Sequence, residues 1–351
     1  MELTIVASGN EGASAPELKQ DDITIKDDNK KQEIVSFEKV IAGPPPAAGQ
    51  PGIHNLVLID CLNTPFSDMP ENRLAILKTL DELAKTDNVT ILMLREGLRV
   101  VSEPSQGAGS MLARIAGQGF SPDKTAAFNW VFSEPNALGD IFTPVPVTGR
   151  NRMDIWIKTL RVVAQNMATR NGRRNLIWIS QYFPPLIMGE TSAGYLEQQA
   201  GADNRSKSAA QVSNSKGRDD LSDTVRKEEA DLLRNYARDI QTTGRLLENA
   251  AVAIYPIDAR YLSRNTASVA DKGRMQDMAK ATGGLSFASP RDIAAAVHDA
   301  LADTRTVYVA RYAMADSLFN GKDHAIKIET RLKDVKLRAL AGYFAAQQPR
   351  Q

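Results

Sequence analysis

The strongest hydrophobic pattern in the chain is an aliphatic run, Leu56-Val57-Leu58-Ile59, which leads directly into Asp60-Cys61-Leu62-Asn63-Thr64. An uninterrupted run of this length is typical of a strand that is buried on both faces of a sheet. Asp60, Asn63 and Thr64 place a carboxylate and two small polar side chains at the carboxyl end of that strand. Because open α/β sheets bind ligands at this edge, these residues are the first candidates for a functional site.

Strand-like and helix-like patterns alternate along the middle of the chain. Apolar runs predict strands over 89–94, 175–180, 251–258 and 285–287, and helical spacing predicts helices over 68–86, 156–167, 233–247, 275–282 and 293–301. The run Leu98–Val101 follows the strand 89–94 after a turn at Glu96-Gly97, and two strands joined by so short a turn are antiparallel. We therefore expect an α/β fold, with a doubly wound, mostly parallel sheet and one antiparallel edge strand.

Both ends of the chain carry β-type patterns alone. Short apolar runs predict strands over 3–6, 23–25 and 34–37, and again over 307–312, 325–330 and 335–340. Because a few short strands gain stability by packing against another layer, we expect the two ends to pack together as a small β-sandwich-like unit. The expected divisions are an N-terminal β unit 1–43, a Pro/Gly linker 44–53, an α/β domain 54–304 with a mobile insertion 189–225, and C-terminal strands 305–345.

Composition narrows the class of protein. A chain of 351 residues with 42% hydrophobic content can bury a substantial core. The 43 Lys and Arg residues against 42 Asp and Glu residues give a formal charge of +1. This balance indicates neither nucleic acid nor an anionic membrane as a partner. We also expect no membrane span and no signal peptide in this chain. The single cysteine, Cys61, lies in an apolar setting that predicts a buried, inert thiol, and Trp156 and Trp178 are expected in the core.

The sequence contains no recognisable set of acid, base and nucleophile. His54, His298 and His324 are widely separated, and none lies beside a serine or cysteine in a catalytic arrangement. No glycine-rich phosphate loop follows the first strand of the α/β domain. Cys61 and Ser180 are nucleophile candidates at strand ends, but the sequence places no base near them. We therefore expect neither a metal cluster built on histidine nor an enzyme.

Five short segments, taken in order, resemble one family. They are 32–38 (QEIVSFE), 58–66 (LIDCLNTPF), 172–180 (GRRNLIWIS), 255–260 (YPIDAR) and 281–284 (ATGG), and together they are similar to the acidobacterial-type VWFA-related domain proteins of the von Willebrand factor A superfamily. The likeness covers residues 20 to 345. The resemblance implies an A-domain fold and a metal-ion-dependent adhesion site, in which an Asp-x-Ser-x-Ser strand end, a loop threonine and a later aspartate hold Mg²⁺ beside a carboxylate of the partner.

This sequence matches that motif only in part. Asp60 matches the first aspartate and Thr64 the second serine, but Leu62 replaces the first serine. Ser180 or Gln181 stands where the later aspartate is expected. The resemblance thus implies a degenerate site in which Asp60 and Thr64 are the metal-ligand candidates and Mg²⁺ the candidate ion.

Further residues extend the candidate site. Thr143 or Thr148 could supply the loop threonine, and the sequence does not choose between them. The full set of partner- or metal-binding candidates is Asp60, Asn63, Thr64, Thr148, Ser180 and Asp258.

Structural roles for the same residues stay open. Asp60 could accept hydrogen bonds from the loop that follows it, with Asn63 and Thr64 stabilising the turn. Asp258 could extend the site or pair with Arg260.

The function expected from these observations is a non-enzymatic, adhesion-type module that binds another protein at the carboxyl edge of its sheet. Loop residues 119–149 and the insertion 189–225 would provide specificity. The alternative is a structural subunit, or a homo-oligomer, that joins its neighbours through the β edges of the terminal strands. Relatives of this kind generally carry an export signal, so the resemblance implies an extracytoplasmic location, secreted or periplasmic.

Overall fold

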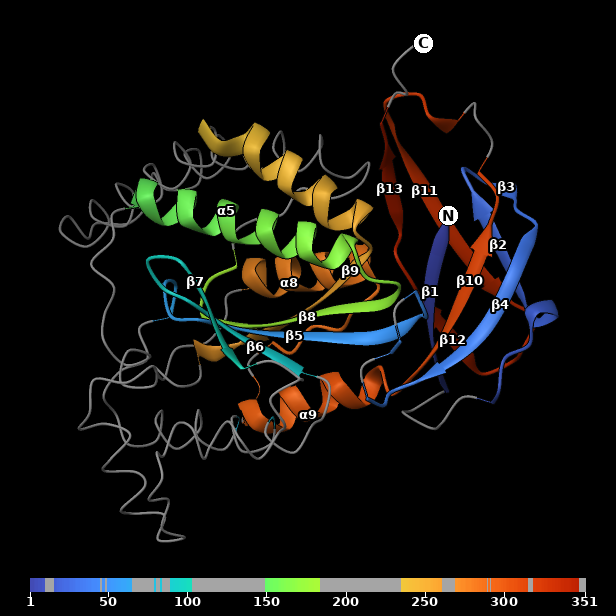
Figure 1. Cartoon of the computed structure of the whole chain (residues 1–351), viewed down its shortest axis with the longest axis horizontal. Coiled ribbons are helices and arrows are strands. Elements are labelled where there is room, and N and C mark those ends of the chain that lie inside the picture. Colours follow the sequence, from blue (N-terminus) through green and yellow to red (C-terminus); the bar gives the residue numbers. More distant parts are fainter. Residues whose placement is uncertain are drawn as a thin grey trace, which may run out of the picture.

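The computed structural model describes residues 1–9, 16–44, 46–47, 49–64, 79, 83, 89–102, 149–183, 235–260, 269–288, 290, 292–314 and 318–346. In this part of the chain an α/β unit lies beside a unit of antiparallel strands (Figure 1). Nearly all of the helix predicted over 68–86, the loop 119–149 up to residue 148, and the insertion 189–225 lie outside the described residues.

The α/β unit is built on a five-stranded sheet with the order β7-β6-β5-β8-β9. Its strands are β5 (Gly52–Asp60), β6 (Val89–Leu94), β7 (Leu98–Ser102), β8 (Gly172–Ser180) and β9 (Val252–Asp258). Four of them are parallel neighbours, and β7 pairs antiparallel with β6 at the edge. The prediction of a mostly parallel sheet with one antiparallel edge strand is therefore confirmed, and β5 lies in the middle of the sheet.

Helices cover both faces of this sheet (Figure 1). On one face lie α5 (Gly149–Ala168), a helix over residues 235–249, and α8 (Val269–Thr282); on the other lies α9 (Ile293–Asp303). Leu56 and Leu58 of β5 pack into the first core, whereas the alternate residues Val57 and Ile59 pack into the second. This alternation explains why the run is apolar at every position: side chains of a strand point to opposite faces, and both faces are covered.

Trp156, Trp178 and Cys61 lie in the core, as predicted. Trp156 of α5 and Trp178 of β8 are buried and stack with their ring centroids 5.8 Å apart. Cys61 is also buried. Among the described helices, none is both long enough and apolar enough to cross a lipid bilayer.

The second unit consists of two four-stranded antiparallel sheets, ordered β12-β1-β10-β4 and β13-β11-β2-β3. Its elements are β1 (Glu2–Gly9), the short 3-10 helix η2 (Gln20–Asp22), β2 (Ile23–Asp27), β3 (Lys30–Lys31), β4 (Ile34–Ile41), β10 (Thr306–Tyr312), β11 (Lys322–Thr330), β12 (Val335–Arg338) and β13 (Gly342–Ala345). Each sheet contains strands from both ends of the chain, and residues of both sheets share one core that includes Leu3, Ile25 and Tyr308.

Several boundaries differ from those expected. Residues 285–287 do not form a strand: only Phe287 makes a single bridge, to Ile257, and Leu285 is 38% exposed. The strand expected over 335–340 ends at Arg338, and β13 follows it. β5 begins at Gly52, inside the range expected for the linker.

Gly172 begins β8, and the helix before it ends at Ala168. It has a φ of +90°, and a Cβ there would lie 2.3 Å from the carbonyl oxygen of Gly52. Glycine is thus required at this position by close contact between the starts of β5 and β8.

Candidate functional site

The carboxyl edge of the parallel sheet gathers five of the six predicted site residues. They are Asp60 at the end of β5, Asn63 and Thr64 in the turn after it, Ser180 at the end of β8 and Asp258 at the end of β9. Ser180 and Asp258 lie opposite each other in the register of β8 and β9. Thr148 lies outside the described residues.

The Asp60 carboxylate is completely buried and accepts hydrogen bonds from four donors. Its Oδ1 accepts from the Asn63 backbone N–H at 2.9 Å, and its Oδ2 accepts from Asn63 Nδ2 at 2.9 Å. Oδ2 also accepts from Trp178 Nε1 at 3.1 Å and from Ser180 Oγ at 3.0 Å. Both carboxylate oxygens are therefore in contact with hydrogens of the protein itself.

Burial raises the pKa of the Asp60 carboxyl above its usual value, and the donors of Asn63, Trp178 and Ser180 oppose this shift. Removal from water disfavours the charged form, whereas hydrogen bonds to the carboxylate favour it. Asp60 thus serves in this arrangement as a fixed acceptor that orients the turn after β5 and ties β5 to β8.

The other residues of the edge complete this network. Thr64 Oγ1 accepts from the Gln181 backbone N–H at 2.9 Å, which links the turn after β5 to the segment after β8. Arg152 of α5 donates to the Leu62 carbonyl oxygen at 2.7 Å. The buried Nε2 of Gln181 has no hydrogen-bond partner among the described groups. The edge therefore contains hydrogen-bond donors, and one of them has no partner among the residues that the structure describes.

Asp258 is fully buried, and its Oδ1 accepts from the backbone N–H of Arg260 at 2.9 Å and from its Nε at 2.8 Å. Arg260 also pairs with Asp271 of α8. The sequence left two roles open for Asp258, extension of the site and pairing with Arg260. The structure shows the pairing with Arg260. A guanidinium group thus lies at the end of β9.

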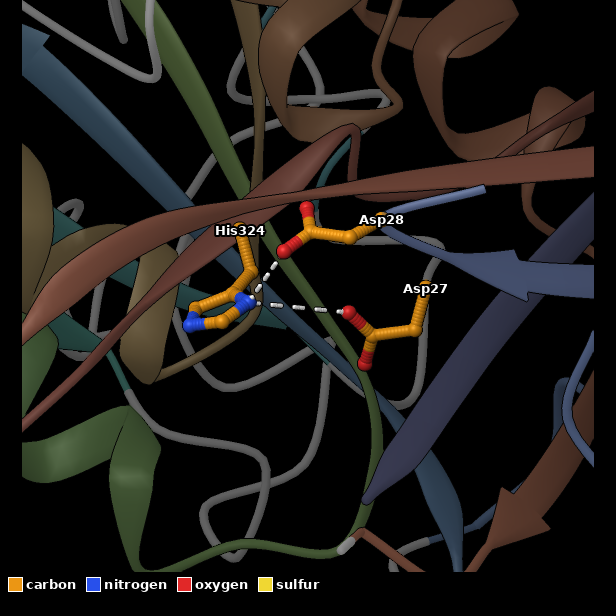
Figure 2. Close-up of side chains that lie close together, drawn as sticks. All are labelled: Asp27, Asp28 and His324. Atoms are coloured by element: carbon orange, nitrogen blue, oxygen red, sulfur yellow. Dashed lines mark hydrogen bonds and ion pairs between the residues drawn. The ribbon is translucent and has the colours of Figure 1, made fainter. Parts of the chain in front are cut away.

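A second group of chemically active residues lies in the antiparallel unit. Asp27, Asp28 and His324 could hold a metal ion, because one potential ligand atom of each lies within 4.8 Å of the others (Figure 2). Asp27 ends β2, Asp28 begins the two-residue turn to β3, and His324 lies on β11. The Nδ1 atom of His324 is 2.7 Å from Asp28 Oδ2 and 4.0 Å from Asp27 Oδ1.

This group was not predicted from the sequence, in which the three histidines are widely separated. The sequence indicated only a turn at residues 26–29, and Asp28 and Asn29 do adopt the positive φ values, 46° and 63°, of a two-residue hairpin turn. His324 joins them because β2 pairs with β11, which is almost 300 residues away in the chain. The local signal was visible in the sequence, whereas the pairing was not.

The chain matches no known family model and no curated protein sequence. Among solved structures it is similar to an aerotolerance-related membrane protein from Bacteroides fragilis with multiple mutations to serines, at 8% identity over 72% of this chain and 99% of that chain, with a TM-score of 0.30. It is also similar to the PilB minor pilin from Streptococcus sanguinis, at 12% identity, 74% and 62% coverage and a TM-score of 0.29. A third is a von Willebrand factor type A protein from Catenulispora acidiphila, at 9% identity, 94% and 75% coverage and a TM-score of 0.22. Similarity at this level establishes neither a family nor a function.

Proposed function

We propose that this chain is a non-enzymatic protein-binding module with an A-domain-like sheet, which recognises its partner at the carboxyl edge and does so without a metal ion at Asp60. The observation that supports this proposal is the network in which Asp60 accepts four hydrogen bonds from Asn63, Trp178 and Ser180. Extracytoplasmic location, which the sequence resemblance implies, belongs to the same proposal.

The chemistry of the edge disfavours Mg²⁺. This ion needs nearly octahedral coordination by oxygen atoms and loses its water reluctantly. At Asp60 the N–H groups of Asn63 and Trp178 direct positive hydrogens to the oxygens that an ion would need. In addition, Leu62 offers no side-chain oxygen, and the carboxylate of Asp258 is paired with Arg260. Hydrogen-bond donors of the protein itself thus occupy the carboxylate oxygens of Asp60 that a metal ion would need.

A partner with acceptor groups fits this edge best. In the A-domain pattern the metal ion binds a carboxylate of the partner. Here Gln181 Nε2 is a donor that has no hydrogen-bond partner among the described residues. We infer that the partner presents an acidic or carbonyl-rich segment to the ends of β5, β8 and β9.

A test uses a photoreactive residue placed at Gln181 and, as a matched control, at the exposed Asp299 on α9, in the full chain expressed in its native cell. We expect a discrete protein adduct from position 181 that is equally abundant with and without added Mg²⁺, and that position 299 does not give. Identical adducts at both positions, or none at 181, would contradict recognition at this edge. An adduct that requires Mg²⁺ would contradict the metal-free mechanism.

The alternative function, assembly through β edges, has its own supporting observation. β4 is the edge strand of its sheet, and its Val35 and Ile41 side chains are 71% and 62% exposed. Large apolar residues on an edge strand favour pairing with another chain. Under this alternative, self-association depends on Val35 and not on Gln181.

A further inference from the structure

We propose that Asp27, Asp28 and His324 form a binding site for a divalent transition-type cation, of which Zn²⁺ is the representative, and that the bound ion joins the N-terminal hairpin to the C-terminal strand β11 (Figure 2). This site lies in the antiparallel unit and does not depend on the function proposed for the carboxyl edge of the α/β sheet.

The separations between the three ligand atoms suit a shared ion. Two ligands at about 2.1 Å from a tetrahedral Zn²⁺ lie about 3.4 Å apart. Asp27 Oδ1 and His324 Nδ1 are 4.0 Å apart, which is close to this value. Asp28 Oδ2, at 2.7 Å from Nδ1, has to move away by less than an ångström, and its side chain is 44% exposed and so has room to rotate. The exposed side of Asp28 also leaves space for a water ligand.

The carboxylate of Asp27 provides a second, independent observation that points to a cation. Its side chain is completely buried, and Oδ2 accepts from the hydroxyls of Tyr312 at 3.0 Å and Tyr343 at 2.9 Å. The other oxygen, Oδ1, accepts no hydrogen bond from any described group and faces His324. A buried carboxylate oxygen without a partner is unfavourable, and a cation at this position would satisfy it.

His324 is oriented so that a ring nitrogen faces the two aspartates. Asn320 Oδ1 accepts from the Lys322 backbone N–H at 3.0 Å, which identifies this atom as the amide oxygen. The same oxygen lies 3.1 Å from His324 Nε2, so Nε2 must be the donor of that contact. In the neutral ring the lone pair is then on Nδ1 and points at carboxylate oxygens. His324 Nδ1, Asp27 Oδ1 and Asp28 Oδ2 are then three acceptors that face one another, and this arrangement requires a cation between them, either a proton or a metal ion.

Groups outside the site hold each of the three residues. The ring of Tyr343 stacks on His324 with centroids 5.2 Å apart, and its hydroxyl contacts Asp27. The Ala325 backbone N–H donates to Asp28 Oδ1 at 2.9 Å. Metal-binding histidines and carboxylates in proteins are supported in this way, because the outer partners fix the tautomer and the orientation of the ligands.

The donor set selects the class of ion. One imidazole nitrogen with two carboxylates is typical of Zn²⁺ and related divalent metals, whereas Mg²⁺ and Ca²⁺ prefer sites made of oxygen alone. Two carboxylates and a neutral imidazole carry a charge of −2, which a divalent ion neutralises. Since Asp28 and His324 are 296 positions apart in sequence, the ion also closes a very long loop, and this should stabilise the folded chain.

The test is calorimetric titration of the chelator-treated, dialysed full chain with ZnCl2, accompanied by thermal unfolding with and without Zn²⁺. We expect one ion to bind per chain and the melting temperature to rise. Asp28→Asn alters an exposed turn residue and should fold, and it should weaken binding by at least about 10-fold. Tyr343→Phe, which removes an outer partner of Asp27, should weaken binding by roughly 10–100-fold.

The matched control is His298→Gln, which removes an exposed imidazole on α9 and should leave Zn²⁺ affinity unchanged. Absence of saturable binding to the native chain would overturn the proposal and leave His324 and Asp28 as a protonated ion pair. Equal affinity of Asp28→Asn and the native chain, or a loss caused by His298→Gln, would also overturn it. Mg²⁺ binding as tight as that of Zn²⁺ would overturn the assignment of the ion class.

Discussion

Replacing Asp60 with alanine should destabilise the folded chain by about 2–4 kcal/mol at neutral pH. Trp178 is completely buried, so its Nε1–H loses its acceptor in the core, which costs about 1–3 kcal/mol. Asn63 is 8% exposed, so water can replace its two lost contacts in part, at roughly 1 kcal/mol. Ser180 keeps its contact with the Tyr182 carbonyl oxygen at 2.9 Å. Relief from burying the carboxylate offsets part of the loss.

The assay is urea unfolding followed by far-ultraviolet circular dichroism and tryptophan fluorescence, with Ser180→Ala as a milder companion. Ser180→Ala should lose about 1 kcal/mol, because Asp60 keeps its other donors. Since burial raises the pKa of Asp60 in the folded state, its contribution to stability is complete below the unfolded pKa of about 4 and falls as the pH rises through the folded pKa. The difference between the native chain and Asp60→Ala should therefore be largest near pH 4 and shrink towards neutral pH.

Two results would refute this account of Asp60. An alanine variant as stable as the native chain at every pH would show that the four hydrogen bonds contribute nothing. Stabilisation of the native chain by Mg²⁺ that the variant lacks would instead identify Asp60 as a metal ligand.

Three further predictions concern other parts of the molecule. Burial lowers the pKa of His54, so its contribution to stability is present above the unfolded pKa of about 6.5 and is lost as the pH falls through the folded pKa. Urea titrations between pH 7 and 5 should show that the free energy of unfolding falls more steeply with decreasing pH in the native chain than in His54→Gln. Equal pH slopes of the two proteins would contradict this. Arg173→Met should reduce the free energy of unfolding by about 2–4 kcal/mol, because the buried guanidinium donates to Tyr255 and to three further groups. An unchanged melting temperature in thermal unfolding would be inconsistent with these bonds. If the chain assembles through β4, Val35→Lys should convert oligomers to monomers in light scattering, whereas Val162→Lys, on the exposed face of α5, should not.

Features set by local sequence could be predicted with good accuracy. The aliphatic residues 56–59 identify a central strand because burial on both faces demands apolar side chains at every position. The antiparallel edge strand could be predicted because two residues of turn permit only one direction for the chain that follows. The placement of Asp60 and Ser180 together follows from the same logic, since parallel strands end at a common edge.

Features set by contacts between distant segments could not be predicted. The arginines at 173 and 174 resemble the basic end of a helix, yet both are buried in β8, where Arg173 bonds to Asn175, Tyr255 and Gly283. Tyr255 and Gly283 are 82 and 110 positions away from Arg173, so the local sequence does not indicate them as acceptors. His324 likewise has no sequence neighbours that mark it, because its partners come from the opposite end of the chain.

The interleaving of the two chain ends affects how the protein is made. β1 lies between β10 and β12, and β10 lies between β1 and β4, so no sheet of this unit can be completed from one end alone. During synthesis at about 5–20 residues per second, β1 waits roughly 15–60 s on the ribosome before the residues of β10 emerge. In that interval its backbone is unpaired, and a chaperone that shields nascent strands should raise the yield of native protein.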